Sequence, residues 1–251
     1  MENKKLLSYL DELLIPWQFK DYCPNGLQVE GKSQVQKVVT GVTASQALID
    51  AAIDINADAI LVHHGYFWKG ESAVVTGMKR NRLKALLEND INLYAYHLPL
   101  DAHPEFGNNA QLAKLLGIQG NEPLERGNAN SVVRHGRILN GISLSDFSHR
   151  VEQQLHRKPL VEASGPDVIH SVAWCTGGGQ SYIELAASNN IDLFITGEAS
   201  EQTIHTAREM GIHFISAGHH ATERYGAKAL GEHLAAELEL EVHFIDIPNP
   251  V

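Results

Sequence analysis

Cysteine is scarce in this sequence, since only Cys23 and Cys175 occur among 251 residues and their spacing forms no motif. A disulfide-stapled fold or a thiolate zinc site is therefore not expected, and the composition is typical of a reducing compartment. No run of about 18 apolar residues occurs, and charged residues interrupt the leucines near the N-terminus. We therefore expect neither a signal peptide nor a membrane partner, and we expect the protein to be cytoplasmic.

Positive charge is also in short supply. The chain has 20 Lys and Arg against 30 Asp and Glu, which gives a net charge of −10. Binding to phosphate backbones requires a surplus of Lys and Arg, so the charge argues against nucleic acid as the main partner. Apolar residues make up 43% of the chain, which is typical of a globular protein with one large α/β domain or two small lobes.

Strand-like and helix-like patterns alternate through the first half. Short β-rich runs at 38–42, 58–62 and 91–96 are separated by helical spacing of apolar residues at 45–55 and 79–88. Strands that alternate with helices imply a mainly parallel sheet with helices on both faces.

The second half repeats this order, with strand-like runs at 172–176, 192–196 and 212–215. Asp58 and Asp192 lie 134 positions apart, and the same offset relates His64 to Glu198. A gapless offset over a strand, a helix and a second strand favours internal duplication over the general likeness of β–α–β units.

We therefore predict a duplicated α/β unit. The first α/β repeat is assigned to residues 1–125, a connecting segment to 126–168, and the second α/β repeat to 169–251. Within the connecting segment, Ser143 or Ser145 is expected to cap a helix.

Histidine is frequent, with 14 in the chain, and three histidine clusters follow predicted strands. The clusters are HH at 63–64, HLPLD at 97–101 and HHATE at 219–223. Imidazole and carboxylate groups are ligands for zinc, iron, manganese or nickel, and the sequence does not select among these metals. Five or six such ligands exceed what one tetrahedral ion takes with an open position, so we predict two divalent ions per subunit.

The spacing within the clusters suggests how the ligands are shared. His63 and His64 are neighbours at the end of a strand, where successive side chains point to opposite faces, so each is expected to serve a different ion. His219 and Glu223 are four residues apart and lie on one helix face if Gly218 opens a helix.

The remaining roles follow from the donor types. Glu223 is expected to bridge the two ions, Asp101 to complete the shell of one ion, and His219 to complete that of the other. His97 is expected to be either a sixth ligand or a catalytic acid/base group near the metal. His220 is left unassigned.

Two weaker signals lie beside these clusters. Tyr66, Trp68 and Lys69 are expected to form a buried aromatic cluster or, alternatively, to bind a base or a phosphate. The glycines at 177–179 permit close approach of a phosphate, but they match neither dinucleotide nor P-loop patterns, and a plain strand-to-helix turn is favoured.

Seven short motifs in this order give the chain a family resemblance. They are PNGLQV at 24–29, VTGV at 39–42, LVHHG at 61–65, HLPLD at 97–101, GNN at 107–109, ITGE at 195–198 and GHHATE at 218–223. On these motifs, which span nearly the whole chain, the sequence resembles the GTP cyclohydrolase 1 type 2 homologues, or NGG-interacting-factor-like family.

The resemblance implies an α/β fold of duplicated three-layer α/β/α units, in two similar intertwined lobes with a dinuclear metal site between them. It also implies a ring-shaped, toroidal homohexamer. The implied metal ligands are His63, His64, Asp101, His219 and Glu223. Longer members carry an inserted domain between the halves, and the connecting segment is too short to hold it.

The function expected from these observations is a metal-dependent hydrolase of a small nucleotide-like or phosphorylated substrate. One alternative is a non-enzymatic metal chaperone or insertase that uses the same ligands for storage or delivery. Another is a ring-shaped interaction protein in DNA maintenance, which the net charge of −10 disfavours.

Overall fold

The computed structural model describes residues 1–251 and divides into two compact units. Unit 1 consists of Met1–Leu100 and Gly226–Ile247, and unit 2 consists of Asp101–Tyr225 and Pro248–Val251. The chain thus leaves unit 1, builds unit 2, returns to unit 1 and ends in unit 2, which is the intertwined path that was predicted. No helix has both the length and the apolar character needed to cross a membrane.

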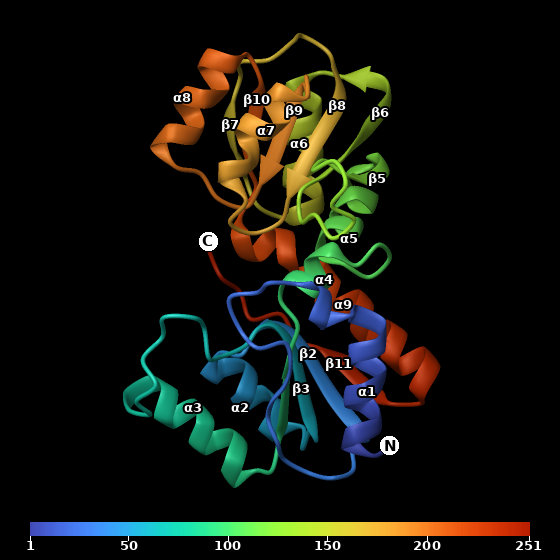
Figure 1. The fold of residues 1–251 in the computed structure, drawn as a ribbon, viewed down its shortest axis with the longest axis vertical. Coiled ribbons are helices and arrows are strands. Elements are labelled where there is room, and N and C mark those ends of the chain that lie inside the picture. The colour runs from blue at the N-terminus through green and yellow to red at the C-terminus, as the bar shows by residue number, and fades with distance from the viewer. The chain divides into compact units, whose positions relative to one another are not determined.

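Unit 1 is built on a five-stranded sheet with the strand order β1-β4-β3-β2-β11 (Figure 1). Its strands are β1 (Gly26–Val29), β2 (Lys37–Thr43), β3 (Ala59–His64), β4 (Asn92–Ala95) and β11 (Glu241–Phe244). Its helices are α1 (Asn3–Leu14), the short 3-10 helix η1 (Pro16–Gln18), α2 (Gln46–Asp54), α3 (Gly77–Glu88) and the later part of α9 (His219–Leu238). Only β1 runs antiparallel to its neighbour, so the prediction of a mainly parallel sheet is confirmed here.

Helices cover both faces of the unit 1 sheet. On one face, Leu48 of α2 and Leu86 of α3 pack in one core with Val39 and Ile60 of the central strands. Figure 1 places α1 and α9 on the opposite side of the sheet, where Gly231 of α9 lies against Thr40 of β2. This is the three-layer arrangement that the sequence predicted.

Unit 2 is built on a six-stranded sheet with the order β5-β6-β8-β9-β10-β7. Its strands are β5 (Gln119–Pro123), β6 (Arg134–Ile142), β7 (Leu160–Glu162), β8 (Ile169–Cys175), β9 (Leu193–Thr196) and β10 (His213–Ser216). Its helices are α5 (Asn108–Leu116), α6 (Leu144–Leu155), the 3-10 helix η2 (Gln180–Tyr182), α7 (Ile183–Ser188), α8 (Glu201–Met210) and the start of α9, while α4 (Leu98–Ala102) runs across the boundary between the units.

The unit 2 sheet is mixed, which corrects the prediction of a mainly parallel sheet for this half. β8, β9 and β10 are parallel to one another, but β5, β6 and β7 join by antiparallel pairing. The reason is that residues 126–168, assigned as the connecting segment, supply β6, α6 and β7, and these two strands join the second sheet. Ser143 caps α6 through the backbone N–H of Asp146, as predicted.

The helices of unit 2 also lie on two faces. Phe147 and Val151 of α6 pack with Trp174 of β8 in one core cluster. Ile183 of α7 and Ala207 of α8 belong to a second core cluster, which includes other residues of β8 and residues of β9. The duplicated three-layer α/β/α arrangement is therefore present in both units.

The duplication extends to the strand register. Val38 pairs with Ala59 between β2 and β3, and Val172 pairs with Leu193 between β8 and β9. Both partners in the second pair lie 134 positions after those in the first. The predicted repeat boundaries at 125 and 168 describe this duplication of sequence rather than the compact units, and they stay a prediction.

Two aspartates at equivalent places in the repeats make the same hydrogen bonds. The Asp58 carboxylate accepts the backbone N–H groups of Gln36 and Lys37 at 3.0 Å each. The Asp192 carboxylate accepts those of His170 and Ser171 at 2.9 and 2.8 Å. Each aspartate thus holds the start of the preceding strand in register.

Substituting Asp58→Asn is expected to lower the free energy of unfolding by about 1–2 kcal/mol at neutral pH, because charge-assisted hydrogen bonds are lost. Burial raises the pKa of Asp58, but hydrogen bonds from Lys32 and from two backbone amides outweigh it and hold the pKa below the usual 3.8. The stabilisation is therefore complete above that value and is lost as the pH falls through the lowered pKa. Urea unfolding between pH 7 and pH 3 measures both effects.

The matched control is Asp167→Asn, since Asp167 is exposed. It is expected to change the free energy of unfolding by no more than about 0.5 kcal/mol. Equal stability of the Asp58→Asn variant and the parent at pH 7 would contradict the assigned role.

Candidate metal centre

The first two predicted ligands lie at the end of β3 in unit 1. His63 is fully buried, and its Nδ1 lies 3.1 Å from the carbonyl oxygen of Tyr96. A carbonyl can only accept a hydrogen bond, so Nδ1 carries the proton and Nε2 carries the lone pair that a metal ion requires. His64 is half-buried, and its Nδ1 lies 3.2 Å from the hydroxyl of Thr43.

The rings of His63, His64 and His97 converge within unit 1. The ring centroids lie 4.4 Å apart for His63 and His64, and 5.1 Å apart for His63 and His97. One ring nitrogen from each of the three histidines lies within 4.8 Å of the others. β3 ends at His64, and both rings turn toward His97, so the alternation of a continuing strand does not separate the two rings. That each histidine serves a different ion stays a prediction.

Asp21 fixes the position of His97, which the sequence did not reveal. Its Oδ1 lies 2.6 Å from Nδ1 of His97, and its Oδ2 accepts the backbone N–H of Leu98 at 3.0 Å. Asn25, in the PNGLQV motif, accepts the backbone N–H of His97 at 2.7 Å. Burial raises the pKa of Asp21, but the hydrogen bonds, led by that of His97, hold the pKa below its usual value.

The aromatic residues after the histidine pair have two different roles. Tyr66 is buried, and its hydroxyl donates to the carbonyl of Ala44 at 2.6 Å, which confirms the structural interpretation for this residue. The Trp68 ring instead lies edge-on to His97, with the ring centroids 5.0 Å apart. Trp68 therefore lies at one side of the cluster formed by His63, His64 and His97.

Asp101 is a buried carboxylate of unit 2 held by residues from two other segments, the start of α5 and the turn after β8. Its Oδ1 accepts the side-chain amide of Asn108 at 2.9 Å and the hydroxyl of Thr176 at 3.1 Å. The Asn109 side chain donates to the backbone carbonyl of Asp101 and accepts the backbone N–H of Thr176. These contacts fix the carboxylate, and they explain why the GNN motif follows the HLPLD motif so closely.

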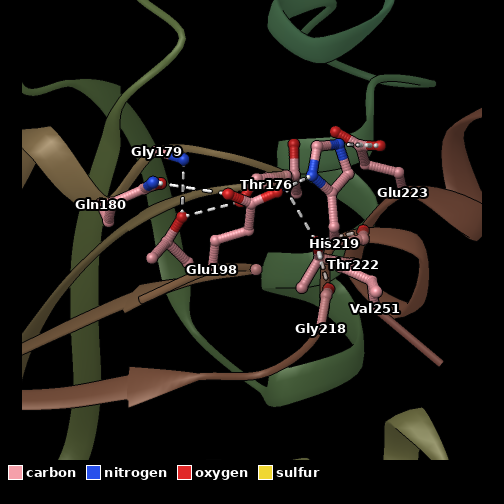
Figure 2. A network of polar contacts seen from close by, with 12 residues as sticks. Thr176, Gly179, Gln180, Glu198, Gly218, His219, Thr222, Glu223 and Val251 are labelled. Carbon is pink, nitrogen blue, oxygen red and sulfur yellow. Dashed lines mark hydrogen bonds and ion pairs between the residues drawn. The ribbon is translucent and has the colours of Figure 1, made fainter. Parts of the chain in front are cut away.

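His219 and Glu223 lie together on the first turns of α9, as predicted. Nε2 of His219 lies 3.2 Å from Oε2 of the buried Glu223, and Nδ1 lies 2.7 Å from Oε1 of Glu198 (Figure 2). Burial lowers the pKa of His219, but the carboxylates of Glu223 and Glu198 raise it by more, so that the pKa is about 9. A cation that binds Nε2 therefore competes with a proton.

The glycines of the turn after β8 approach this pair. The turn joins β8 to η2 and α7, so the predicted strand-to-helix turn is confirmed. Gly177 has φ +64, and a Cβ placed there would overlap Oε1 of Glu223 and lie 3.0 Å from Nε2 of His219. The turn thus also shapes the surroundings of two predicted ligands, a role that the sequence did not indicate.

His220, left unassigned from the sequence, is buried next to His219. Its backbone N–H donates to a backbone oxygen of Val251 at 2.9 Å, so residues 248–251 contact the start of α9. This contact gives His220 a structural place beside the predicted ligands.

The donor set fits a divalent cation. The predicted ligands offer imidazole nitrogens in unit 1 (His63, His64) and carboxylates with an imidazole in unit 2 (Asp101, His219, Glu223), the ligands that zinc, iron, manganese and nickel accept. Cys23 lies near Asp21 and His97, but burial and the charge of Asp21 raise the pKa of its thiol to about 12. Without a bound cation this thiol is therefore protonated at neutral pH.

These observations define a class of protein. It is a duplicated α/β chain in which histidine and carboxylate groups follow the central strands. The model of the Duf34/NIF3 (NGG1p interacting factor 3) family matches residues 1–250. The chain belongs to this family, as its motifs predicted.

Similar proteins match over the full length. A protein of Haemophilus influenzae named GTP cyclohydrolase 1 type 2 homolog is 59% identical over 251 residues, which is 100% of both chains. A solved structure described as protein ybgI of unknown function is 58% identical with a TM-score of 0.97, and covers 100% of both chains. The structure of TTHA1606 from Thermus thermophilus is 37% identical with a TM-score of 0.91, again over 100% of both chains.

Proposed function

We propose that this protein is a metal-dependent hydrolase of a small nucleotide-like or phosphorylated substrate, with two divalent ions per subunit. The proposed ligands are His63, His64, Asp101, His219 and Glu223. His97 is proposed as an acid/base group or a sixth ligand.

The observation that carries this proposal is the close approach of donor atoms within each unit. Ring nitrogens of His63, His64 and His97 lie within 4.8 Å of one another in unit 1. In unit 2, Nε2 of His219 lies 3.2 Å from Oε2 of Glu223. The 3.2 Å separation of the second pair suits two donors that each lie about 2.0–2.2 Å from one ion.

Divalent ions at such ligands polarise an electrophile and make a water molecule acidic, which is the chemistry that hydrolysis requires. The chain's own residues would supply orientation and proton transfer. Nδ1 of His97 is paired with Asp21 at 2.6 Å, so the ring is held and Nε2 is the atom that can exchange a proton with a substrate. Trp68 lies edge-on to the same ring and would border a substrate bound there.

The substrate class has separate support. Relatives such as the Haemophilus influenzae protein carry the name GTP cyclohydrolase 1 type 2 homolog, which refers to nucleotide chemistry. An exposed aromatic, Tyr22, and the Trp68 ring both lie beside His97, and planar bases stack on such rings. These features favour a nucleotide-like compound over a purely aliphatic phosphoester.

Elemental analysis of gently purified protein, followed by a panel of nucleotides and phosphoesters with that metal restored, tests the proposal. Turnover that disappears on chelation and returns with metal supports a hydrolase. No turnover, together with transfer of the bound ions to an apo-enzyme, would contradict the hydrolase and favour the metal chaperone or insertase.

Replacing His97 by glutamine separates its two proposed roles. As an acid/base group, its loss is expected to lower kcat by about 10²–10⁴-fold while the metal content stays at the wild-type level. As a sixth ligand, its loss is expected to lower the metal content as well. Measuring turnover and metal content on the same preparation decides between them, and a variant unchanged in both would contradict either role.

We also propose that the subunits form a ring-shaped homohexamer in the cytoplasm, as the family resemblance implies. The hexamer should show a solution mass of about six times the 27.6 kDa of the chain. Light scattering during size-exclusion chromatography measures this mass, and a monomer at micromolar concentration would contradict the assembly.

A further inference from the structure

Glu198 occupies a place in the second repeat that a predicted metal ligand occupies in the first. It lies 134 positions after His64, and the same offset relates the paired strands β2 and β3 to β8 and β9. In the first repeat this place holds an imidazole, whereas in the second it holds a carboxylate. The duplication therefore kept a polar side chain here and changed its chemistry.

The carboxylate of Glu198 contacts the ring nitrogen of His219 that faces away from Glu223. Oε1 of Glu198 lies 2.7 Å from Nδ1, and Oε2 of Glu223 lies 3.2 Å from Nε2 (Figure 2). A carboxylate beside Nδ1 favours the tautomer in which Nδ1 carries the proton. Nε2 then offers its lone pair on the side of Glu223, the other proposed ligand.

Glu198 is itself held in place. The Gln180 side-chain amide lies 3.4 Å from Oε2 of Glu198, and Figure 2 shows Glu198 between Gln180 and His219. The preceding Gly197 donates its N–H to Gly177 at 2.8 Å and accepts the Ser216 hydroxyl at 2.9 Å. The carboxylate therefore projects from a fixed backbone, which is what a group that orients another side chain needs.

The first repeat contains the same kind of pair. His97 and His219 both follow the third central strand of their repeat, and Nδ1 of His97 lies 2.6 Å from Oδ1 of Asp21. Asp21 comes from the segment before β1, whereas Glu198 comes from the end of β9, so the two carboxylates are not equivalent in sequence. Two unrelated positions thus place a carboxylate against Nδ1 of equivalent histidines.

We propose that Glu198 is a positioning residue for metal binding, which holds the His219 ring so that Nε2 faces the ion. This inference rests on the proposed metal centre, and it assigns a role to a residue outside the proposed ligand set. Loss of such a hydrogen-bond partner of a ligating histidine typically lowers metal affinity by about 10–100-fold.

The test compares zinc affinity, by competition with a chromophoric chelator, in the full-length protein and three variants. Glu198→Ala is expected to lower the affinity about 10–100-fold, and Glu198→Gln, which keeps an acceptor oxygen without its charge, is expected to lower it less. Glu201→Ala is the control, because Glu201 is an exposed carboxylate three residues after Glu198. The zinc affinity of this variant should stay within about twofold of wild type. The visible spectrum of protein loaded with cobalt should change in Glu198→Ala and not in Glu201→Ala.

Unchanged zinc affinity and an unchanged cobalt spectrum in folded Glu198→Ala overturn the inference, as does an equal loss in Glu201→Ala. If Glu198→Ala does not fold, Glu198→Gln decides: reduced zinc affinity supports the role, and wild-type affinity overturns it. A wild-type protein that binds neither zinc nor cobalt overturns the proposed metal centre itself, and the inference with it. Metal binding by the wild type without a difference among variants overturns the role of Glu198 alone.

Discussion

Replacement of Glu223 by alanine is expected to remove most of the bound metal and to lower zinc affinity by more than about 100-fold. Glu223 is only 2% exposed, and its Oε2 faces Nε2 of His219 at 3.2 Å. As the proposed bridge, Glu223 would be a ligand of both ions. Its removal should therefore lower zinc affinity by more than the roughly 10–100-fold expected when a group outside the ligand set is removed. Elemental analysis and chelator competition measure the two quantities.

The control for this variant lies on the same helix. Glu232 is exposed on α9, and Glu232→Ala should keep wild-type metal content because it changes charge without touching the proposed ligands. Glu223→Gln keeps the side-chain volume and should also lose metal, since a neutral amide is a weaker ligand than a carboxylate. Full metal occupancy in Glu223→Ala would contradict the bridging role.

The duplication could be predicted from the sequence because corresponding residues of the two repeats are separated by a constant number of positions. The offset between Asp58 and Asp192 needs no knowledge of packing, and the structure reproduces it in strand register and in matching backbone hydrogen bonds. The strands from 38 to 96 and from 172 to 215 were also predictable, because buried parallel strands form short, strongly apolar runs.

Elements with weak hydrophobic patterns were not predicted. β5 (Gln119–Pro123) is polar and lies at an edge of its sheet, and β11 pairs with only one neighbour. α8 (Glu201–Met210) has few apolar residues, and its cap pairs Ser200 with Thr203 rather than with the Glu or Gln of the usual capping pattern. Edge elements bury little surface, so sequence periodicity specifies them poorly.

The proposed ligands could be predicted from the sequence, but the groups that orient them could not. Asp21 is 76 residues from His97, and Thr176 is 75 residues from Asp101. No local pattern links such pairs, because the fold alone brings them together. The approach of the His63 and His64 rings to His97 was not predictable for the same reason, because His97 follows a different strand.

Gly177→Ala is expected to lower both the stability of the protein and its zinc affinity. Gly177 has φ +64, where an alanine costs about 1–2 kcal/mol. Its Cβ would also overlap Oε1 of Glu223, and crowding of this kind costs about 1–3 kcal/mol more. Relief of the overlap requires Glu223 to move, which would displace the carboxylate from His219. Urea unfolding and chelator competition measure the two effects.

Gly127→Ala separates the backbone contribution from the crowding. Gly127 has φ +80 and nothing within 4 Å of a Cβ, so its substitution should cost only the backbone strain and leave zinc affinity unchanged. In a Glu223→Ala background the crowded carboxylate is gone, and there Gly177→Ala should cost less than in the parent and approach the cost of Gly127→Ala, since only the contact with Nε2 of His219 at 3.0 Å remains. An equal cost of Gly177→Ala with and without Glu223 would mean that the glycine serves the turn alone. A cost that shrinks when Glu223 is removed means that the absence of a side chain at position 177 makes room for this carboxylate.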